Sequence, residues 1–554
     1  MERLQFRVLF RVFMLRVVDL ELLSADGDPT KLLGQFAALL AGISFLFCLP
    51  LLLVGGGWRE TDLWTMEHLF VAATMLAIGL FSVLNWDSIF PDRRDVLVLA
   101  PLPVAPRTIF AAKLSALGSA LFISVLALNV FTGLLWPMYF SSADGALAVL
   151  RSFGAYWTTV LTAAAFMLFF VLTLLGVASL LPRQLFLRLS VLLQVAAFCL
   201  FIGVFIVEPT SVTPEVLREP GVQCLPTFWF FGLFQQLNGV TGPMQSVIAE
   251  LAHRAWIALA IAASGAMATL LLSYFHTLRK IVESPDIVSG SHRIKWPVTF
   301  GKSLQGAVTS FCLRTLLRSR SHRVILSFYF GVGFAIVLAY VVALYAGGLS
   351  SRGAASAFVS APFLSASILM MCISIGGIRI VASMPIALRA NWIFRITELQ
   401  QPSAYIAAVR RAFVVISVLP IWLASAVLFF SVWPLRLALE HLLVLGLLGM
   451  ILVEATLHGF KKIPFTCSYL PGKGNLQYVF WACALLLLPL INAGAQIEMR
   501  MLNSLFGYSA LLVALSLALA ITRWRTAAVL TPTTQMQFDE VEAPELLSLS
   551  LTRE

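Results

Sequence analysis

Long runs of apolar residues recur along almost the whole chain of 554 residues, and they constrain its fold more than any other feature. A helix needs roughly 20 such residues to cross the hydrocarbon layer of a bilayer. Barrel strands would alternate in polarity, and these runs do not. We therefore predict an all-α polytopic membrane protein with about twelve transmembrane helices, at 33–55, 66–86, 112–136, 154–180, 185–207, 255–275, 324–346, 357–381, 411–432, 437–458, 476–494 and 503–522.

The composition excludes several other classes of protein. Hydrophobic residues make up 60% of the chain and charged residues 12%, against about 45–50% and about 25% in soluble domains. A soluble enzyme, a disordered chain and a secreted disulfide scaffold are therefore excluded. The net charge of +11 reflects basic cytoplasmic loops rather than a nucleic-acid partner. The seven cysteines form no CxxC motif, which argues against a disulfide framework and a cysteine metal site.

The distribution of Lys and Arg predicts the orientation. With the N-terminus placed inside, 31 of the 38 basic residues fall in cytoplasmic segments. Basic residues concentrate on the cytoplasmic side of membrane proteins, so both termini are predicted to be cytoplasmic. The remaining seven lie in the outer segments: Arg59, Arg151, Arg218, Arg254, Arg352, Arg436 and Arg500.

The spans also divide into two sets of six around a basic connector. The segments 102–107 (LPVAPR) and 384–389 (MPIALR) match at an offset of 282 residues. We therefore predict two parallel six-helix repeats, related by an axis along the membrane normal. The expected domains are a first transmembrane half at 1–280, a cytoplasmic connector at 281–323, a second half at 324–524 and a cytoplasmic tail at 525–554.

An amphipathic helix is predicted in front of each half. In the N-terminal segment, Arg3, Arg7 and Arg11 fall on one helical face and apolar residues fill much of the rest. The connector holds a similar piece around Arg314 and Arg318. Both patterns are typical of helices that lie in the membrane interface. The alternative is an ordinary basic flank that only sets the topology.

Motifs for nucleotide and metal chemistry are absent from the sequence. The two Gly-Lys pairs, at 301–302 and 472–473, lack the earlier glycine of a phosphate-binding loop, and no GxGxxG or HExxH occurs. The seven histidines form no cluster at metal-ligand spacing. We therefore expect no catalytic residue, metal or cofactor on this chain, and any nucleotide hydrolysis on another one.

The segment 92–114, DRRDVLVLAPLPVAPRTIFAAKL, resembles the loop after the second helix of ABC-2-type exporter permeases. It has an acidic residue, an apolar patch, a Leu-Pro pair, a basic residue and an apolar stretch that reaches Lys113. The resemblance extends to an interfacial N-terminal helix, six spans in the half and a longer outer segment, here 208–253. That segment carries an aromatic-rich stretch at 225–232, suited to the outer membrane interface. The loop of the second half keeps a Pro and an Arg but lacks the acidic cluster.

The resemblance implies that the first loop forms a short coupling helix seated in a groove of an ATPase. It implies a separate ATP-binding subunit, in two copies, that uses the ATP, with membrane lipid as the other partner and no nucleic acid. The alternative is a solvated loop whose arginines only fix the topology. The implied contact residues are Asp92, Arg93, Arg94, Asp95, Leu102, Pro103 and Arg107, and in the second half Pro385, Arg389, Asn391 and Arg395.

Ionisable residues inside a span are candidates for function. The tenth predicted span contains Glu440, His441, Glu454 and His458. Glu454 and His458 are four residues apart and are expected to pair on one helical face. These four residues have either a structural role near the span ends or a lining or coupling role. Asn129 and Gln194 are expected to form hydrogen bonds between helices.

The expected function is that of the membrane subunit of an ATP-driven exporter in the bacterial cytoplasmic membrane. The apolar spans suit lipids, hydrophobic drugs and lipid-linked glycans alike. One alternative is a secondary transporter of 6+6 helices, against which we count missing glycines beside Asp92 and an expected lack of buried charge pairs. Others are a non-transport scaffold, or a membrane-embedded enzyme acting on lipid-linked substrates through Glu208 and His253.

Overall fold

A computed structural model describes most of the chain. The described residues are 2–18, 29–54, 58–85, 102–141, 145–181, 183–209, 211–239, 242–283, 303–319, 361–382, 402–458, 464–465, 476–502 and 504–529, with scattered positions between 322 and 337. All regular structure among them is helical. Eight of these helices are long and apolar enough to cross a membrane, which agrees with an all-α multi-pass membrane protein. The count of twelve stays a prediction.

The chain divides into two compact units, Met1–His292 and Arg293–Glu554. Unit 1 contains α1 (Glu2–Val18), α2 (Pro29–Leu46), α3 (Leu49–Val54), α4 (Glu60–Leu84), α6 (Pro106–Asn129), α7 (Thr132–Leu135), α8 (Pro137–Phe140), α9 (Ala146–Ser179), α10 (Arg183–Val207), η2 (Val216–Arg218), α11 (Pro220–Gln223), α12 (Pro226–Asn238) and α13 (Gln245–Glu283).

Proline explains where one predicted span of unit 1 is interrupted and where α8 begins. The span 33–55 is two helices, α2 and α3, which are separated at Phe47 and Cys48 just before Pro50. The span 112–136 ends as α6 at Asn129, and the short helices α7 and α8 follow, the second beginning at Pro137. Proline has no N–H for the helical ladder but is well suited to the first turn of a new helix.

The segment 208–253 of unit 1, which is predicted to lie outside, is folded into the helical bundle. Helix α12 packs against α4, α9 and α13. Phe228, Phe230 and Phe231 are fully buried in these contacts. The expectation that the stretch 225–232 lines the outer membrane interface is therefore wrong for these three side chains, because neighbouring helices cover them.

Unit 2 contains α14 (Leu304–Arg318), α16 (Ala361–Ala382), α18 (Pro402–Phe413), the π-helix η5 (Val414–Val418), α19 (Leu419–Val432), α20 (Leu435–Leu457), α21 (Leu476–Leu502) and α22 (Leu505–Val529). The predicted span 411–432 begins within α18 and continues through η5 into α19. Pro420 lies just after the π-helical turn. Its ring would clash with the carbonyl group four residues earlier in a regular α-helix, and a wider turn relieves that clash.

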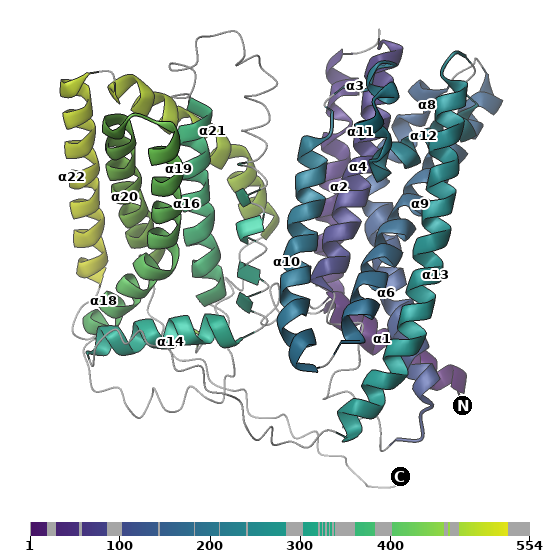
Figure 1. Cartoon of the computed structure of the whole chain (residues 1–554), viewed down its shortest axis with the longest axis horizontal. Helices are drawn as coiled ribbons and strands as arrows, with labels where there is room; N and C mark the ends of the chain where they lie inside the picture. The colour runs from purple at the N-terminus through teal and green to yellow at the C-terminus, as the bar shows by residue number, and fades with distance from the viewer. Residues whose placement is uncertain are drawn as a thin grey trace, which may run out of the picture. The chain divides into compact units, whose positions relative to one another are not determined.

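The two units pack their helices in the same order. In unit 1, α4 packs against α9 and α10, and α9 packs against α13. In unit 2, α16 packs against α20 and α21, and α20 packs against α22. Within each unit, Figure 1 shows these long helices running side by side. The helices α4, α9, α10 and α13 thus have counterparts in α16, α20, α21 and α22.

The offset of 282 residues does not align the corresponding helices of the two units. Helices α4 and α16 end at Leu84 and Ala382, which are 298 residues apart, and α6 and α18 begin at Pro106 and Pro402, which are 296 apart. The segment 102–107 leads directly into α6, whereas 384–389 directly follows α16. The short sequence match therefore lies at different distances along the chain from the helices that precede and follow it in the two units.

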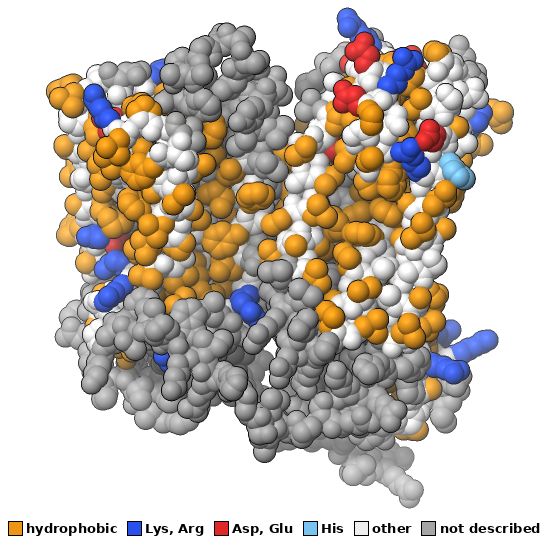
Figure 2. All heavy atoms as spheres, viewed as in Figure 1, with side chains coloured by type: hydrophobic (Ala, Val, Ile, Leu, Met, Phe, Trp, Pro, Cys, Tyr) orange, Lys and Arg blue, Asp and Glu red, His pale blue; other side chains and the backbone are white. Residues whose placement is uncertain are grey.

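The two predicted amphipathic helices are present as α1 and α14. Within its unit, α14 runs crosswise at the ends of the long helices (Figure 1). Arg3, Arg7 and Arg11 are exposed on α1, as predicted from their spacing. Figure 2 shows hydrophobic side chains along the visible face of each unit, and in unit 1 the visible acidic and basic side chains gather towards the ends. This distribution suits helices that are surrounded by lipid along their middle.

Candidate functional site

The structure describes three of the predicted ATPase contacts. Leu102, Pro103 and Arg107 are exposed at the start of α6. The other residues of the two predicted coupling loops lie outside the described residues: Asp92, Arg93, Arg94, Asp95, Pro385, Arg389, Asn391 and Arg395. Their contact role stays a prediction, and the described geometry concerns the helices into which these loops lead.

Helix α1 holds the end of the first loop. The side-chain amide of Gln5 donates to the backbone carbonyl of Pro103 at 3.2 Å. Leu9 and Phe13 are buried in a cluster with alanines of α6. The Lys113 ammonium lies 5.1 Å from the centroid of the Phe13 ring, within the range of a cation–π contact. Helix α1 and the first turns of α6 therefore form one packed element.

Helix α14 has the same relation to α18 in unit 2. The Ser303 hydroxyl accepts a hydrogen bond from the Gly306 N–H at 3.2 Å and caps the helix. Val308, Cys312 and Leu316 are buried in a core that includes alanines of α18. Burial raises the pKa of the Cys312 thiol to about 12, so this cysteine stays protonated and packs as a small apolar side chain.

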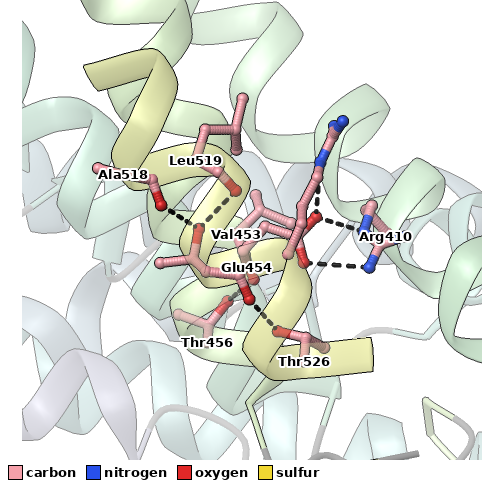
Figure 3. Close-up of polar contacts among 9 residues, drawn as sticks. Arg410, Val453, Glu454, Thr456, Ala518, Leu519 and Thr526 are labelled. Atoms are coloured by element: carbon pink, nitrogen blue, oxygen red, sulfur yellow. Dashed lines mark hydrogen bonds and ion pairs between the residues drawn. The ribbon is translucent and has the colours of Figure 1, made fainter. Parts of the chain in front are cut away.

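Glu454 is the buried centre of an ion-pair cluster in unit 2 whose two arginines are partly exposed (Figure 3). Its side chain is 1% exposed. The Arg410 guanidinium contacts both carboxylate oxygens, with Nε at 2.5 Å from Oε1 and Nη2 at 3.1 Å from Oε2. Arg523 donates from Nε to Oε1 at 3.3 Å. The cluster joins α18, α20 and α22, and Glu454 pairs with these two arginines rather than with His458, which is exposed at the end of α20.

His441 is fully buried near the other end of α20. Its Nδ1 is 2.6 Å from Oε1 of Glu498 on α21, and its Nε2 is 2.8 Å from the hydroxyl of Ser367 on α16. The rings of Phe429 and Trp433 on and beside α19 lie 4.8 Å and 5.9 Å from the imidazole. Unlike His441, the neighbouring Glu440 pairs near the surface, with the exposed Arg436.

Unit 1 buries a related set of side chains. Glu208, just after α10, accepts a hydrogen bond from the Thr227 hydroxyl at 2.6 Å and lies 3.7 Å from Nε2 of His68. Burial raises the pKa of Glu208 to about 7, and the Thr227 hydrogen bond offsets part of that rise. Glu208 and His253, the candidate residues of the alternative membrane-embedded enzyme, are not brought together, because Glu208 faces His68 and His253 is exposed on α13.

A neutral hydrogen-bond network joins the helices in the middle of unit 1. The Tyr156 hydroxyl donates within reach of both Asn129, at 2.7 Å, and Thr132, at 3.0 Å. Asn129 also exchanges hydrogen bonds with Thr74. The Gln194 amide donates to the backbone carbonyl of Val83 on α4 at 2.8 Å. The predicted interhelical roles of Asn129 and Gln194 are confirmed.

The expectation that the spans lack buried charge pairs is wrong. Arg410 and Arg523 reach Glu454 from two other helices, and Glu498 reaches His441 from a third. Only pairs within one helix can be recognised from sequence spacing, so these partners went unrecognised. The sequence offered one signal for Glu498, which is the length of the helix that contains it. The predicted span 476–494 stops before Glu498, whereas α21 extends to Leu502 and includes it.

Phe465, in the loop after α20, has a structural role. Phe465 has a φ of 64°, and its N–H donates to the carbonyl of Ala382 at the end of α16 at 2.8 Å. Its buried ring packs against Phe311 of α14 and the His322 imidazole. Phe465 thus ties the ends of two helices of unit 2 together.

Comparison with known proteins adds no identification. The chain matches no family model, no curated protein and no solved structure. Within the described part of the chain, no group of three His, Cys, Asp or Glu side chains is placed to hold a metal ion.

Proposed function

We propose that this chain is the permease subunit of an ATP-driven ABC-type exporter in the bacterial cytoplasmic membrane. A separate ATPase, bound in two copies, would supply the energy. One observation carries the proposal: in each unit, the helix that follows a predicted coupling loop packs near its start against an amphipathic helix, α1 on α6 and α14 on α18. A partner that displaces the loop would therefore move two packed helices together.

The Glu454 cluster extends this connection in unit 2. Arg410 is on α18, which follows the second predicted loop, and Glu454 and Arg523 are on α20 and α22. Ion pairs inside a membrane protein hold their geometry because separating the charges there is costly. Displacement of α18 would therefore act on α20 and α22. The transported substrate would be lipophilic or lipid-linked, in keeping with the apolar helices.

The proposal includes twelve spans as two six-helix repeats with both termini cytoplasmic. The matching order of helix packing in the two units supports the repeat. The two loops differ in charge, because the first has Asp92 and Asp95 beside Arg93 and Arg94, whereas the second has arginines and no carboxylate before Glu398. A surface with both signs of charge orients a partner more specifically than a surface with one.

Charge reversal in the first loop tests the proposal. Arg93→Glu combined with Arg94→Glu should release the ATPase and abolish ATP-dependent transport, because like charges in an interface cost several kcal/mol. Membrane insertion should be retained, because Arg107 and Lys113 still mark this side as cytoplasmic. The measurements are pull-down of the ATPase and the amount of the chain in the membrane.

The matched variant is Arg389→Glu combined with Arg395→Glu, which should weaken ATPase binding less. Equal losses from both loops would refute their inequality. Retained binding in both variants would refute the coupling role, as would ATP hydrolysis by the purified chain alone.

A secondary, ion-coupled transporter is the second candidate function. The buried Glu454 and His441 clusters favour it, because ion-coupled transporters keep ionisable groups within their spans. Substrate movement in liposomes driven by a proton gradient, with no ATPase present, would select this candidate over the exporter.

A further inference from the structure

Three short polar contacts form a continuous series through His441, near the N-terminal end of α20. The Ser367 hydroxyl oxygen is 2.9 Å from the Leu364 carbonyl oxygen and 2.8 Å from His441 Nε2. On the other side of the ring, Nδ1 is 2.6 Å from Glu498 Oε1. All three distances are within the range of hydrogen bonds. Ser367, His441 and Glu498 are all buried.

The number of hydrogens available to these atoms identifies the protonation state in which all three contacts are hydrogen bonds. A serine hydroxyl has one hydrogen to donate. If it donates to the Leu364 carbonyl, Nε2 of His441 must carry a hydrogen and donate to the Ser367 oxygen. One further hydrogen then bridges Nδ1 and Glu498. All three contacts are satisfied only when the histidine–glutamate pair holds two protons and is neutral overall.

Loss of one proton would leave contacts and charge unsatisfied. Ser367 would have to turn from Leu364 to a bare Nε2, and the pair would carry a net negative charge. Oε2 of Glu498 is buried without a hydrogen-bond partner, and the rings of Phe429 and Trp433 flank the imidazole. A net charge in such surroundings is costly.

Other charged groups on the packed helices do not supply the missing compensation. On α20, Arg436 is engaged with Glu440 near the surface. Near His441, α21 also has Arg500, which is exposed. Helix α22 has Tyr508, whose hydroxyl donates to the Glu440 carbonyl. Helix α19 faces the imidazole with the apolar ring of Phe429. The remaining ionisable residues of α16, α18 and α22 lie further along their helices: Cys372, Arg379, Tyr405, Arg410, Arg411, Arg523 and Arg525.

We propose that Ser367, His441 and Glu498 form a proton-binding site that joins α16, α20 and α21. Release of the proton would loosen the contact among these three helices. The inference does not depend on ATP-driven export, since it concerns proton occupancy within the chain itself.

Unit 1 provides an independent parallel. Thr227, His68 and Glu208 repeat the combination of a hydroxyl, a histidine and a glutamate, and Glu208 follows α10, the counterpart of α21. There the histidine and glutamate are 3.7 Å apart, and Nε2 of His68 has no hydrogen-bond partner. The histidine and the glutamate are thus within hydrogen-bond distance in unit 2 and too far apart for a hydrogen bond in unit 1.

The same three side chains in unit 2 also suggest a nucleophilic serine. In a Ser–His–acid arrangement of that kind, the serine hydroxyl must donate to the histidine. In the proposed protonation state the Ser367 hydroxyl instead donates to the Leu364 carbonyl, 2.9 Å away. The two interpretations therefore differ in whether Nε2 of His441 carries a hydrogen.

The test compares thermal unfolding of the full chain in detergent from about pH 6 to about pH 9. In the wild type, the unfolding midpoint should fall as the site loses its proton. Glu498→Gln keeps the shape of the side chain and removes the charge, so its midpoint should fall by about 5 °C less over this range. Glu250→Gln, which changes an exposed glutamate of unit 1, should behave like the wild type. Equal falls in the wild type and Glu498→Gln would overturn the proposal.

A second measurement does not depend on the folding of a variant. Nitrogen NMR of wild-type protein with labelled histidines should show a hydrogen on Nε2 of His441 at neutral pH. The signal is assigned by its absence in His441→Gln, or from the sequence-specific resonances of the wild type if that variant fails to fold. A bare Nε2 that accepts from Ser367 would overturn the proposal. Covalent labelling of Ser367 by a fluorophosphonate would overturn it as well, and would identify a nucleophilic serine.

Discussion

Unit 1 and unit 2 pack corresponding helices in the same order, but one polar connection between helices is neutral in unit 1 and its largest counterpart in unit 2 is charged. In the middle of unit 1, α4, α6 and α9 are joined by the neutral side chains of Thr74, Asn129 and Tyr156. In unit 2, charged side chains join α18, α20 and α22, with Arg410 and Arg523 on Glu454. One order of helix packing therefore accommodates two kinds of polar connection.

The difference has energetic consequences. A neutral hydrogen bond contributes modestly, and losing one partner leaves a dipole unpaired. A buried carboxylate depends on its partners much more strongly, because removal of one leaves a charge in a medium of low polarity. Single substitutions should therefore have larger effects in the charged clusters of unit 2 than in the neutral network of unit 1.

The largest effect is expected from Arg410→Leu, which removes the main partner of Glu454. Glu454 is 1% exposed and would keep only the longer contact with Arg523. We expect a loss of about 3 kcal/mol, the lower end of the range for breaking a buried pair, because Arg410 is itself partly exposed. The measurement is unfolding of the full chain in detergent by heat or denaturant.

The control for this prediction is Arg411→Leu, which removes the neighbouring, exposed arginine on the same helix. Its effect should be within about 0.5 kcal/mol. Similar losses for the two variants would show that Glu454 does not depend on Arg410.

The second prediction concerns pH and unit 1. The folded-state pKa of Glu208 is about 7, above its ordinary value of 4.5. The unfolded chain therefore releases this proton first, and stability falls as pH rises from 4.5 to about 7. The loss at pH 7 and above is roughly 3 kcal/mol at most. Glu208→Gln should flatten stability across this interval, and an unchanged pH profile would contradict the role of burial at this site.

A smaller loss is expected from Gly232→Ala in α12. The added Cβ would lie 2.5 Å from the Leu251 Cβ and 3.2 Å from the backbone nitrogen of Ala252. Backbone cannot yield easily, so we expect a loss of about 1–3 kcal/mol in thermal or denaturant unfolding. Gly154→Ala in α9 is the control, because nothing lies within 4 Å of its added Cβ. Gly449→Ala in unit 2 would meet side-chain atoms only and should cost less.

The smallest effects compare a tyrosine hydroxyl in each unit. Tyr156→Phe removes a buried hydroxyl that both Asn129 and Thr132 contact, and should cost about 1–2 kcal/mol. Tyr508→Phe removes one hydrogen bond to the Glu440 carbonyl near the surface, and should cost about 0.5 kcal/mol. The difference between the two unfolding free energies measures how far the neutral network stabilises unit 1. Equal costs would argue against a special role for that network.

Much of the fold follows from local pattern. Apolar runs located long helices such as α9 and α20, because burial in lipid requires the whole run to be apolar. The arginine spacing of the N-terminal segment located α1, because basic residues that recur every four positions fall on one face of a helix. The division of 33–55 into α2 and α3 was overlooked although Pro50 lies at that point. The hydrophobic pattern predicts where helices form, whereas the exact points of interruption depend on the local backbone.

The candidate site was only partly predictable. His441 and Glu454 were selected from the sequence as ionisable residues in a span, and both are central to buried clusters. The expected partner of Glu454 was His458, the residue one turn away, whereas its actual partners are 44 and 69 positions away along the chain. Spacing within one helix carries no information about the side chains that neighbouring helices bring to it.

The sequence by itself determined that the chain forms apolar helices, with amphipathic helices at the start of each unit, because these features depend on each segment and its solvent. Only the tertiary structure decided which helices adjoin, that the aromatic stretch at 225–232 is buried, and that Glu498 lies against His441. These outcomes depend on contacts between residues far apart along the chain. In an apolar helix, leucines that face lipid and leucines that face another helix have the same chemistry, so packing alone distinguishes them.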